Sequence, residues 1–219
     1  MPDQRLLFSK TGRARFISHL DLMRTFQRAF LRAGISIKHT EGFNPHAFVS
    51  IALPLSVGYS SRCEVLEFGL LGGAEQAEVP ARLNAVLPEG IEVHLCCDAQ
   101  KPIKALTWVD YQIELDYETP VAAQAAGHLT EVLSQSSYVV KKKSKKAKTG
   151  FVELDLIPLV RSFDLSVKEN RVCLHLVVKA QNPGMNPALL LDTLPEELKP
   201  DYTSFTRQCV LDENGELFS

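Results

Sequence analysis

Apolar residues follow two different periodicities in the first hundred positions. Residues 5–10 form a short apolar run typical of a strand, and later apolar positions recur with the spacing of a helix. Ser18 and Asp21 have the spacing of a capping box, and Gly34 stands where a helix commonly ends, so a helix is predicted over 19–33. Further strands are predicted over 35–39, 48–53, 63–70 and 91–97, and a short helix over 78–87.

The second half of the chain has a similar pattern. Residues 108–117 alternate between apolar and polar, as a half-buried strand does. Thr119 and Pro120 are typical of the start of a helix, which is predicted to end near Ser134. The remaining elements are strands over 138–142, 151–157, 171–179 and 204–211, and a helix over 186–194.

Each half therefore has the order strand, helix, strand, strand, helix, strand, once an extra hairpin strand is allowed in the second half. This βαββαβ order is typical of the ferredoxin-like fold. We expect an α+β protein of two tandem ferredoxin-like units with antiparallel sheets. The predicted domains are 1–99 and 106–219, joined by a linker over 100–105 that contains Lys-Pro.

Composition indicates an ordinary globular protein without resident metals. Of the 219 residues, 45% are hydrophobic, and no apolar run is long enough to span a bilayer. The amino-terminal residues lack a signal-peptide layout, and the five cysteines include no CxxC pair. P-loop, GxGxxG and HExxH motifs are missing too. We expect a cytoplasmic protein with reduced thiols, no membrane contact, no metal and no cofactor.

Charge is distributed unevenly along the chain. The net charge of -2 excludes a uniformly basic nucleic-acid-binding protein. Residues 1–50 nevertheless have a balance of +5, residues 51–100 of -5, residues 101–150 of +3 and residues 151–219 of -5. The two basic segments can form local positive patches on a nearly neutral protein, or their charges can scatter over different faces.

Basic side chains in these segments are candidates for phosphate contacts. Arg13 and Arg15 precede a predicted helix N-terminus, a position that favours anions. Three further arginines follow at i, i+4 and i+8 on one helix face, and six lysines occupy residues 141–148. Alternatively, the arginines are solvated and the lysines only keep a hairpin soluble. The candidate nucleic-acid-binding residues are Arg13, Arg15, Arg24, Arg28, Arg32, Asn44, Lys141, Lys142, Lys143, Lys145 and Lys146.

Two histidines in the same region are candidate catalytic residues. His19 stands at the start of the first predicted helix, and His46 lies in a loop rich in Gly, Asn and Pro. If they met, they could act as general base and acid in attack by an RNA 2′-hydroxyl. A ferredoxin-like unit puts these two positions at opposite ends of its sheet, and each histidine then has a structural role.

Three segments carry a family resemblance: GRARFISHLDLMR, GFNPHAFVSIALPLSVG and ELDLIPLVRSF. With them, nearly the whole chain closely resembles the bacterial family of radical-SAM-linked proteins, the DUF2344 family. The resemblance implies a domain that partners a radical SAM protein or is fused to one. This chain lacks the cysteines of an iron–sulfur cluster, so it resembles the stand-alone partner. Ala47 and Ser56 depart from the family, whose members often have Pro at both positions.

Three functions are compatible with these patterns. We expect a non-catalytic RNA-binding accessory protein that presents tRNA or rRNA to a radical SAM enzyme. The first alternative is a metal-independent endoribonuclease that uses His19 and His46. The second is a protein–protein adaptor that binds the radical SAM partner without contacting RNA.

Overall fold

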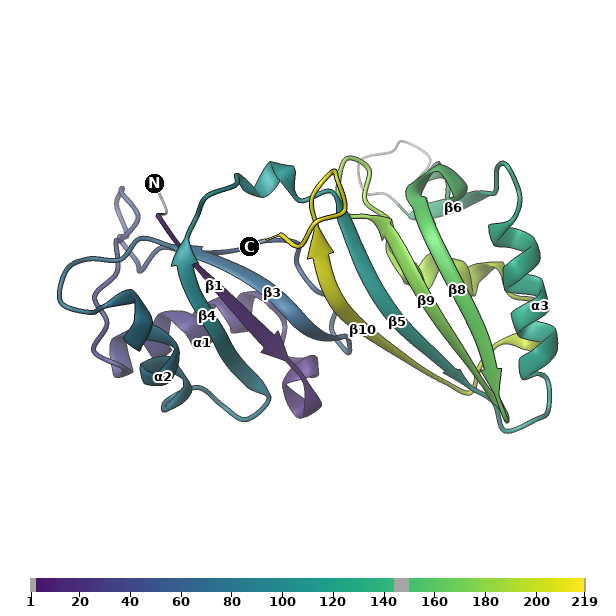
Figure 1. Cartoon of the computed structure of the whole chain (residues 1–219), viewed down its shortest axis with the longest axis horizontal. Helices are drawn as coiled ribbons and strands as arrows, with labels where there is room; N and C mark the ends of the chain where they lie inside the picture. Colours follow the sequence, from purple (N-terminus) through teal and green to yellow (C-terminus); the bar gives the residue numbers. More distant parts are fainter. Residues whose placement is uncertain (1–2, 144–149, 219) are drawn as a thin grey trace. The chain divides into compact units, whose positions relative to one another are not determined.

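The protein is a mixed α+β protein whose sheets are mostly antiparallel (Figure 1). The computed structural model describes residues 3–143 and 150–218. The chain forms two compact units. The first unit comprises Met1–Leu106 and Thr206–Ser219, and the second comprises Thr107–Phe205.

The first unit contains a sheet with strand order β4-β1-β3, and β2 pairs with β3 on the side away from β1. These strands are antiparallel, whereas β10 joins β3 in parallel through Thr206 and Arg207. The strands of this unit are β1 (Gln4–Lys10), β2 (Val49–Ile51), β3 (Ser60–Phe68), β4 (Ile91–Asp98) and the carboxyl-terminal part of β10 (Tyr202–Leu211). Its helices are α1 (His19–Arg32), α2 (Val79–Asn84) and the short 3-10 helices η1 (Gly12–Phe16), η2 (Gln76–Glu78) and η3 (Ile103–Ala105).

Aromatic side chains pack α1 against its sheet. Phe8 of β1 and Phe26 of α1 are fully buried, and their ring centroids are 4.7 Å apart. Phe30 and Phe68 form a second pair at 4.8 Å. The apolar residues of α1 recur every three or four positions and therefore lie on one face, which packs on these strands. The opposite face of α1 is left to solvent.

The second unit is built on an antiparallel sheet with strand order β5-β9-β8. Its first strand alternates buried and half-buried residues along its whole length, which is the pattern of a strand with one face on the core. The elements are β5 (Trp108–Asp116), α3 (Ala122–Leu133), β6 (Val139–Lys143), β7 (Phe151–Asp155), η4 (Ile157–Leu159), β8 (Val160–Lys168), β9 (Arg171–Lys179), η5 (Pro187–Thr193), η6 (Glu196–Leu198) and the start of β10. Strands β6 and β7 form a separate two-stranded hairpin.

Several predicted elements differ from the observed ones. The strand expected over 35–39 is reduced to isolated bridges at Ile37 and His39. The helix expected over 186–194 is a 3-10 helix, η5, whose Asn186 side chain accepts a hydrogen bond from the amide of Ala188. Strand β8 was not predicted from the sequence, and the predicted strands over 138–142 and 151–157 form the separate hairpin β6–β7.

The division into units also differs from the predicted domains. Residues 206–219 pack with the first unit rather than with 106–205. The parallel pairing of β10 with β3 and the stacking of Arg5 on Phe218, 4.6 Å from its centroid, hold this segment there. These contacts join positions far apart in the chain, so local patterns do not reveal them. Within the described ranges, no helix is long and apolar enough to cross a membrane.

Candidate nucleic-acid interface

Helix α1 begins and ends as its sequence predicts. The hydroxyl of Ser18 accepts a hydrogen bond from the amide of Asp21 at 3.2 Å and donates one to its carboxylate at 2.7 Å. The hydrogen bond from Ser18, with a second from Arg24, lowers the pKa of Asp21 below its usual value. At the other end, Arg82 donates to the carbonyl oxygens of Ala33 and Gly34. Both ends of the helix are thus tied down.

Three arginines follow one another along the solvent face of this helix. Arg24, Arg28 and Arg32 are all exposed. Arg24 forms an exposed ion pair with Asp21 at 3.1 Å, but Arg28 and Arg32 form none with any described residue. Like charges at this spacing destabilise a helix by about 0.2–0.5 kcal/mol per pair. The pair with Asp21 and the position in the last turn favour Arg24 and Arg32 in the helix, but helix stability does not account for Arg28 between them.

A shallow depression lies beside the second half of this row. Arg28 and Arg32 line it together with Pro88, and its volume is about 380 Å³. The depression lies between α1 and the turn that leads into β4. Two guanidinium groups at its rim, one helical turn apart, can each donate hydrogen bonds to a phosphate oxygen.

The two arginines before α1 differ in exposure. Arg13 is exposed on η1. Arg15 is half-buried, and its guanidinium lies over the Phe16 ring at 4.8 Å from the centroid. The carbonyl oxygen of Arg15 accepts hydrogen bonds from the buried Lys10 ammonium and from the amide of Gly58. The backbone of Arg15 therefore holds the loop before β3 against η1, while its side chain lies on Phe16.

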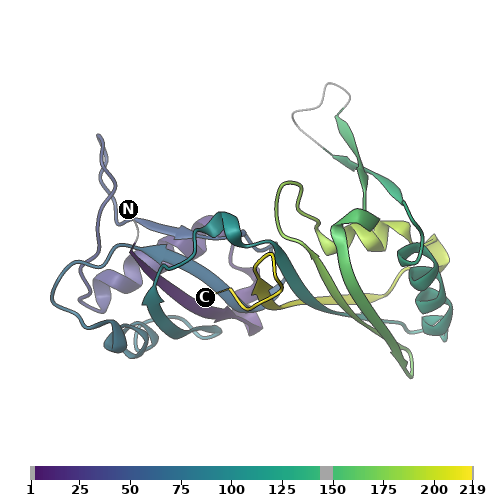
Figure 2. The same ribbon diagram turned by 45° about the horizontal axis from the view of Figure 1, so that its top comes forward.

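The GFNPH segment forms a loop beside the middle of α1. Thr40 and His46 close the loop, since the amide of Thr40 donates to the carbonyl of His46 at 2.8 Å. The side chain of Gln27 donates to the carbonyl oxygen of Ala47 at 2.9 Å, which joins the loop to α1. Asn44 is exposed near the tip. Figure 2 shows this loop projecting from the first unit at the upper left.

The two candidate catalytic histidines are not joined by any hydrogen bond or ion pair among the described residues. His19 is half-buried at the first residue of α1. His46 is exposed, and its Nδ1 lies 3.1 Å from Thr40 Oγ1 and 3.2 Å from the carbonyl oxygen of Asn44. His46 Nδ1 therefore braces its own loop.

The lysine-rich segment belongs to the second unit. Lys141 is exposed on β6. Lys142 and Lys143 continue this strand, but their side chains, like Lys145 and Lys146 as a whole, lie outside the described residues. Each unit thus carries its own group of candidate phosphate contacts.

Comparison with known proteins identifies the family. The family model described as "Uncharacterized protein conserved in bacteria (DUF2344)" matches residues 4–187. The chain belongs to the DUF2344 family. No curated protein matches it in sequence.

Two solved structures resemble this DUF2344 chain. The crystal structure of a Cbf5-Nop10-Gar1 complex matches with a TM-score of 0.54 at 10% identity. That match covers 95% of this chain but 49% of the other, so the chain spans about half of its length. The structure of an unknown protein from Galdieria sulphuraria matches with a TM-score of 0.30 at 10% identity, covering 94% and 96% of the two chains. At 10% identity, the likeness to the Cbf5-Nop10-Gar1 structure shows the fold alone.

The first unit of the DUF2344 chain also buries charged side chains that the sequence analysis missed. Glu64 and Arg207 form an ion pair at 2.8 Å with almost no exposed surface. Arg207 also donates to the carbonyl oxygen of Leu53 at 2.9 Å. Lys10 is 1% exposed, and burial lowers its pKa. The sequence did contain a signal for them: each charged residue stands within an apolar run, at a position that should face the core. A charged side chain at such a position is usually paired or functional.

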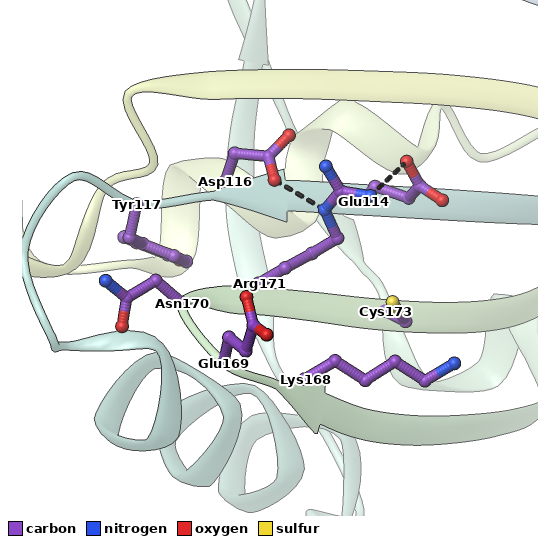
Figure 3. A pocket seen from close by; sticks show the side chains of 8 residues that line it. All are labelled: Glu114, Asp116, Tyr117, Lys168, Glu169, Asn170, Arg171 and Cys173. Carbon is purple, nitrogen blue, oxygen red and sulfur yellow. Dashed lines mark hydrogen bonds and ion pairs between the residues drawn. The ribbon is translucent and has the colours of Figure 1, made fainter.

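A polar pocket of about 460 Å³ lies in the second unit, at the turn between β8 and β9 (Figure 3). Arg171 forms ion pairs with Asp116 at 2.5 Å and with Glu114 at 3.5 Å across the sheet. These pairs raise the pKa of Arg171, the hydrogen bond that it donates to Asp116 contributing most. Of the two basic side chains that line the pocket, Arg171 and Lys168, the first is therefore already neutralised by its neighbours.

The cysteines of the DUF2344 chain are free thiols. Burial raises the pKa of Cys63 and of Cys96 to about 12, so both stay protonated near neutral pH. Among residues 3–143 and 150–218, no group of three or more His, Cys, Asp or Glu side chains is arranged to hold a metal ion.

Proposed function

We propose that this protein is a non-catalytic RNA-binding accessory protein that works with a radical SAM enzyme in tRNA or rRNA modification. The carrying observation is the row of exposed arginines on α1, in which neither Arg28 nor Arg32 forms an ion pair within 4 Å among the described residues. Guanidinium groups in such a row match the repeating phosphates of a nucleic-acid backbone. The enzyme partner follows from the family resemblance.

We also infer that both units are ferredoxin-like. In the first unit, strand order β4-β1-β3 with β2 beyond β3, and helices after β1 and β3, support this assignment. In the second, the order β5-β9-β8 supports it, with η5 in place of a second helix. In such a unit, each helix packs one face on the sheet, and its opposite face is free for a ligand.

RNA affinity measured across a range of salt concentrations tests the proposal. Filter binding with a structured RNA should give an affinity that falls as salt rises, because phosphate contacts release counterions. No measurable affinity, or an affinity indifferent to salt, would contradict an RNA-binding role.

An adaptor function is a second candidate, and exposed apolar side chains on the same helix favour it. Leu20 is 64% exposed and Leu31 is 81% exposed. Large exposed apolar side chains commonly mark a protein interface. Co-purification with the radical SAM partner that resists nuclease and high salt would favour this function over the first.

The endoribonuclease alternative has a direct test as well. Structured RNA would be incubated in EDTA with the unaltered protein and, separately, with the His19→Ala and His46→Ala variants. Cleavage that disappears with either change would favour a nuclease. Intact RNA throughout would leave the accessory and adaptor functions.

A further inference from the structure

The tip of the loop over 40–47 carries a fully solvent-exposed aromatic side chain. Phe43 is 106% exposed, so it contacts little of the rest of the chain. Full burial of such a side chain stabilises a folded protein by about 1.5–3 kcal/mol. This protein lacks that stabilisation at Phe43. The loop that holds it is braced, because His46 bonds to Thr40 through its backbone and its side chain. A braced loop loses little conformational entropy when a ligand binds its tip.

This loop contacts α1 beside the first arginine of the basic row. Gln27, whose side chain bonds to Ala47 at the base of the loop, lies one helical turn from Arg24. The loop with its protruding Phe43 ring and the row of guanidinium groups therefore belong to the same helix and its surroundings. Proteins that bind single-stranded nucleic acid use this combination: basic side chains follow the backbone, and aromatic rings stack on bases.

We propose that Phe43 stacks on an unpaired base of an RNA strand whose phosphates lie along α1. This inference rests on the proposed RNA-binding function and names its ligand: single-stranded or looped RNA rather than a continuous duplex. A paired base is already stacked on its neighbours and offers no free face to a protruding ring. The loop also carries the exposed Glu41, whose charge opposes a phosphate, so the contact of the tip is with a base. Asn44 beside the ring offers an amide to the edge of that base.

The test compares a short labelled RNA strand with the fully paired duplex of the same sequence, using fluorescence anisotropy and the full chain. Phe43→Ala should weaken binding of the single strand about five- to a hundredfold and leave duplex binding unchanged. Phe43→Trp should keep the affinity for the single strand, because stacking needs an aromatic ring and not phenylalanine itself. The dependence on salt should stay the same in both variants, because neither removes a phosphate contact.

A matched control and a charge variant separate the possible failures. Tyr202→Ala removes a half-exposed aromatic ring from the second unit, and it should leave the affinities for single strand and duplex unchanged. Arg28→Ala should weaken single strand and duplex alike and reduce the salt dependence. If the unaltered protein binds neither RNA, the proposed function fails and the stacking role fails with it. If Arg28→Ala weakens binding but Phe43→Ala does not, RNA binding stands and the stacking role is overturned, including the case in which Phe43 instead enters a pocket on a partner protein.

Discussion

The two units handle charge differently. In the first, Glu64 and Arg5 have side chains with no exposed surface, and each is bonded to a partner within the unit. In the second, the pairs of Arg171 with Glu114 and Asp116 keep a third to a half of each side chain exposed. Among the described residues, every buried charged side chain belongs to the first unit.

This difference shows which unit depends on electrostatics for its shape. Buried pairs lose hydration that their attraction only partly repays, so they are a weak source of stability. Here, however, they position loops: Arg207 holds the carbonyl of Leu53, and Lys10 holds that of Arg15. Both loops border the start of α1. The second unit relies on apolar packing of α3 against its sheet.

The largest effect is expected from breaking a buried pair. Glu64→Ala leaves the Arg207 guanidinium buried without its carboxylate partner, and should lower the free energy of unfolding by about 3–5 kcal/mol. Urea denaturation followed by circular dichroism measures this change. The double variant Glu64→Leu/Arg207→Met should lose much less, since no charge is left buried. A loss below about 1 kcal/mol in the single variant would remove the contrast between the units.

A slightly smaller effect is expected from the apolar core of the second unit. Leu129 of α3 is fully buried, and Leu129→Ala should cost about 2–5 kcal/mol through lost burial and the cavity it leaves. Fluorescence of Trp108, the single tryptophan of the chain, reports unfolding of this unit. Stability equal to that of the unaltered protein would mean that α3 is not essential to this core.

Acid should loosen one part of the first unit. A hydrogen bond from Lys101 at 2.7 Å lowers the pKa of Asp212, which also accepts bonds from the amides of Asn214 and Glu216. A carboxyl with a lowered pKa stabilises the fold above its unfolded pKa, and this contribution is lost as pH falls through the folded value. Protection of the amides at 214–218 from hydrogen exchange, relative to the intrinsic exchange rate at each pH, should therefore fall below about pH 4. In Asp212→Asn, the amides at 214–218 should already be poorly protected at neutral pH. If they remain protected, the carboxylate does not anchor this segment.

The smallest effect is expected at the exposed ion pairs of the second unit. Asp116→Ala removes a partner of Arg171, which keeps Glu114 as a second one. Exposed pairs contribute about 0–1 kcal/mol, so the free energy of unfolding should change by no more than this. The same urea titration measures it. A loss as large as that of Glu64→Ala would show that charge matters equally in both units.

Local patterns predicted the elements whose signals are local. The Ser18 cap and the apolar spacing predicted α1 to within a residue or two, and the alternation over 108–117 predicted β5 to within one residue. The arginine row was predicted for the same reason, since helical spacing alone puts its members on one face. The return of 206–219 to the first unit depends on pairing across more than a hundred residues, and no local signal encodes it.

The candidate site was predicted in parts but not as a whole. The sequence indicated the basic row and the GFNPH loop separately, and the bond from Gln27 to Ala47 that joins the loop to α1 has no local signal. Buried charges were missed because a charged residue in an apolar run is usually solvent-facing. Only the structure shows that Arg15, a predicted phosphate contact, is half-buried against Phe16.

The measurement that tests the account most directly compares charge reversals in the two units. RNA affinity would be measured against salt concentration for the unaltered protein, for Arg28→Glu/Arg32→Glu and for Lys141→Glu, with circular dichroism confirming that each is folded. We predict that the double variant on α1 loses at least about tenfold in affinity and that its salt slope falls by about 1.4, as expected for two lost contacts to a single strand, whereas Lys141→Glu loses less. Unchanged affinity and slope in the α1 variant, or a larger loss in Lys141→Glu, would contradict an RNA interface on the first unit.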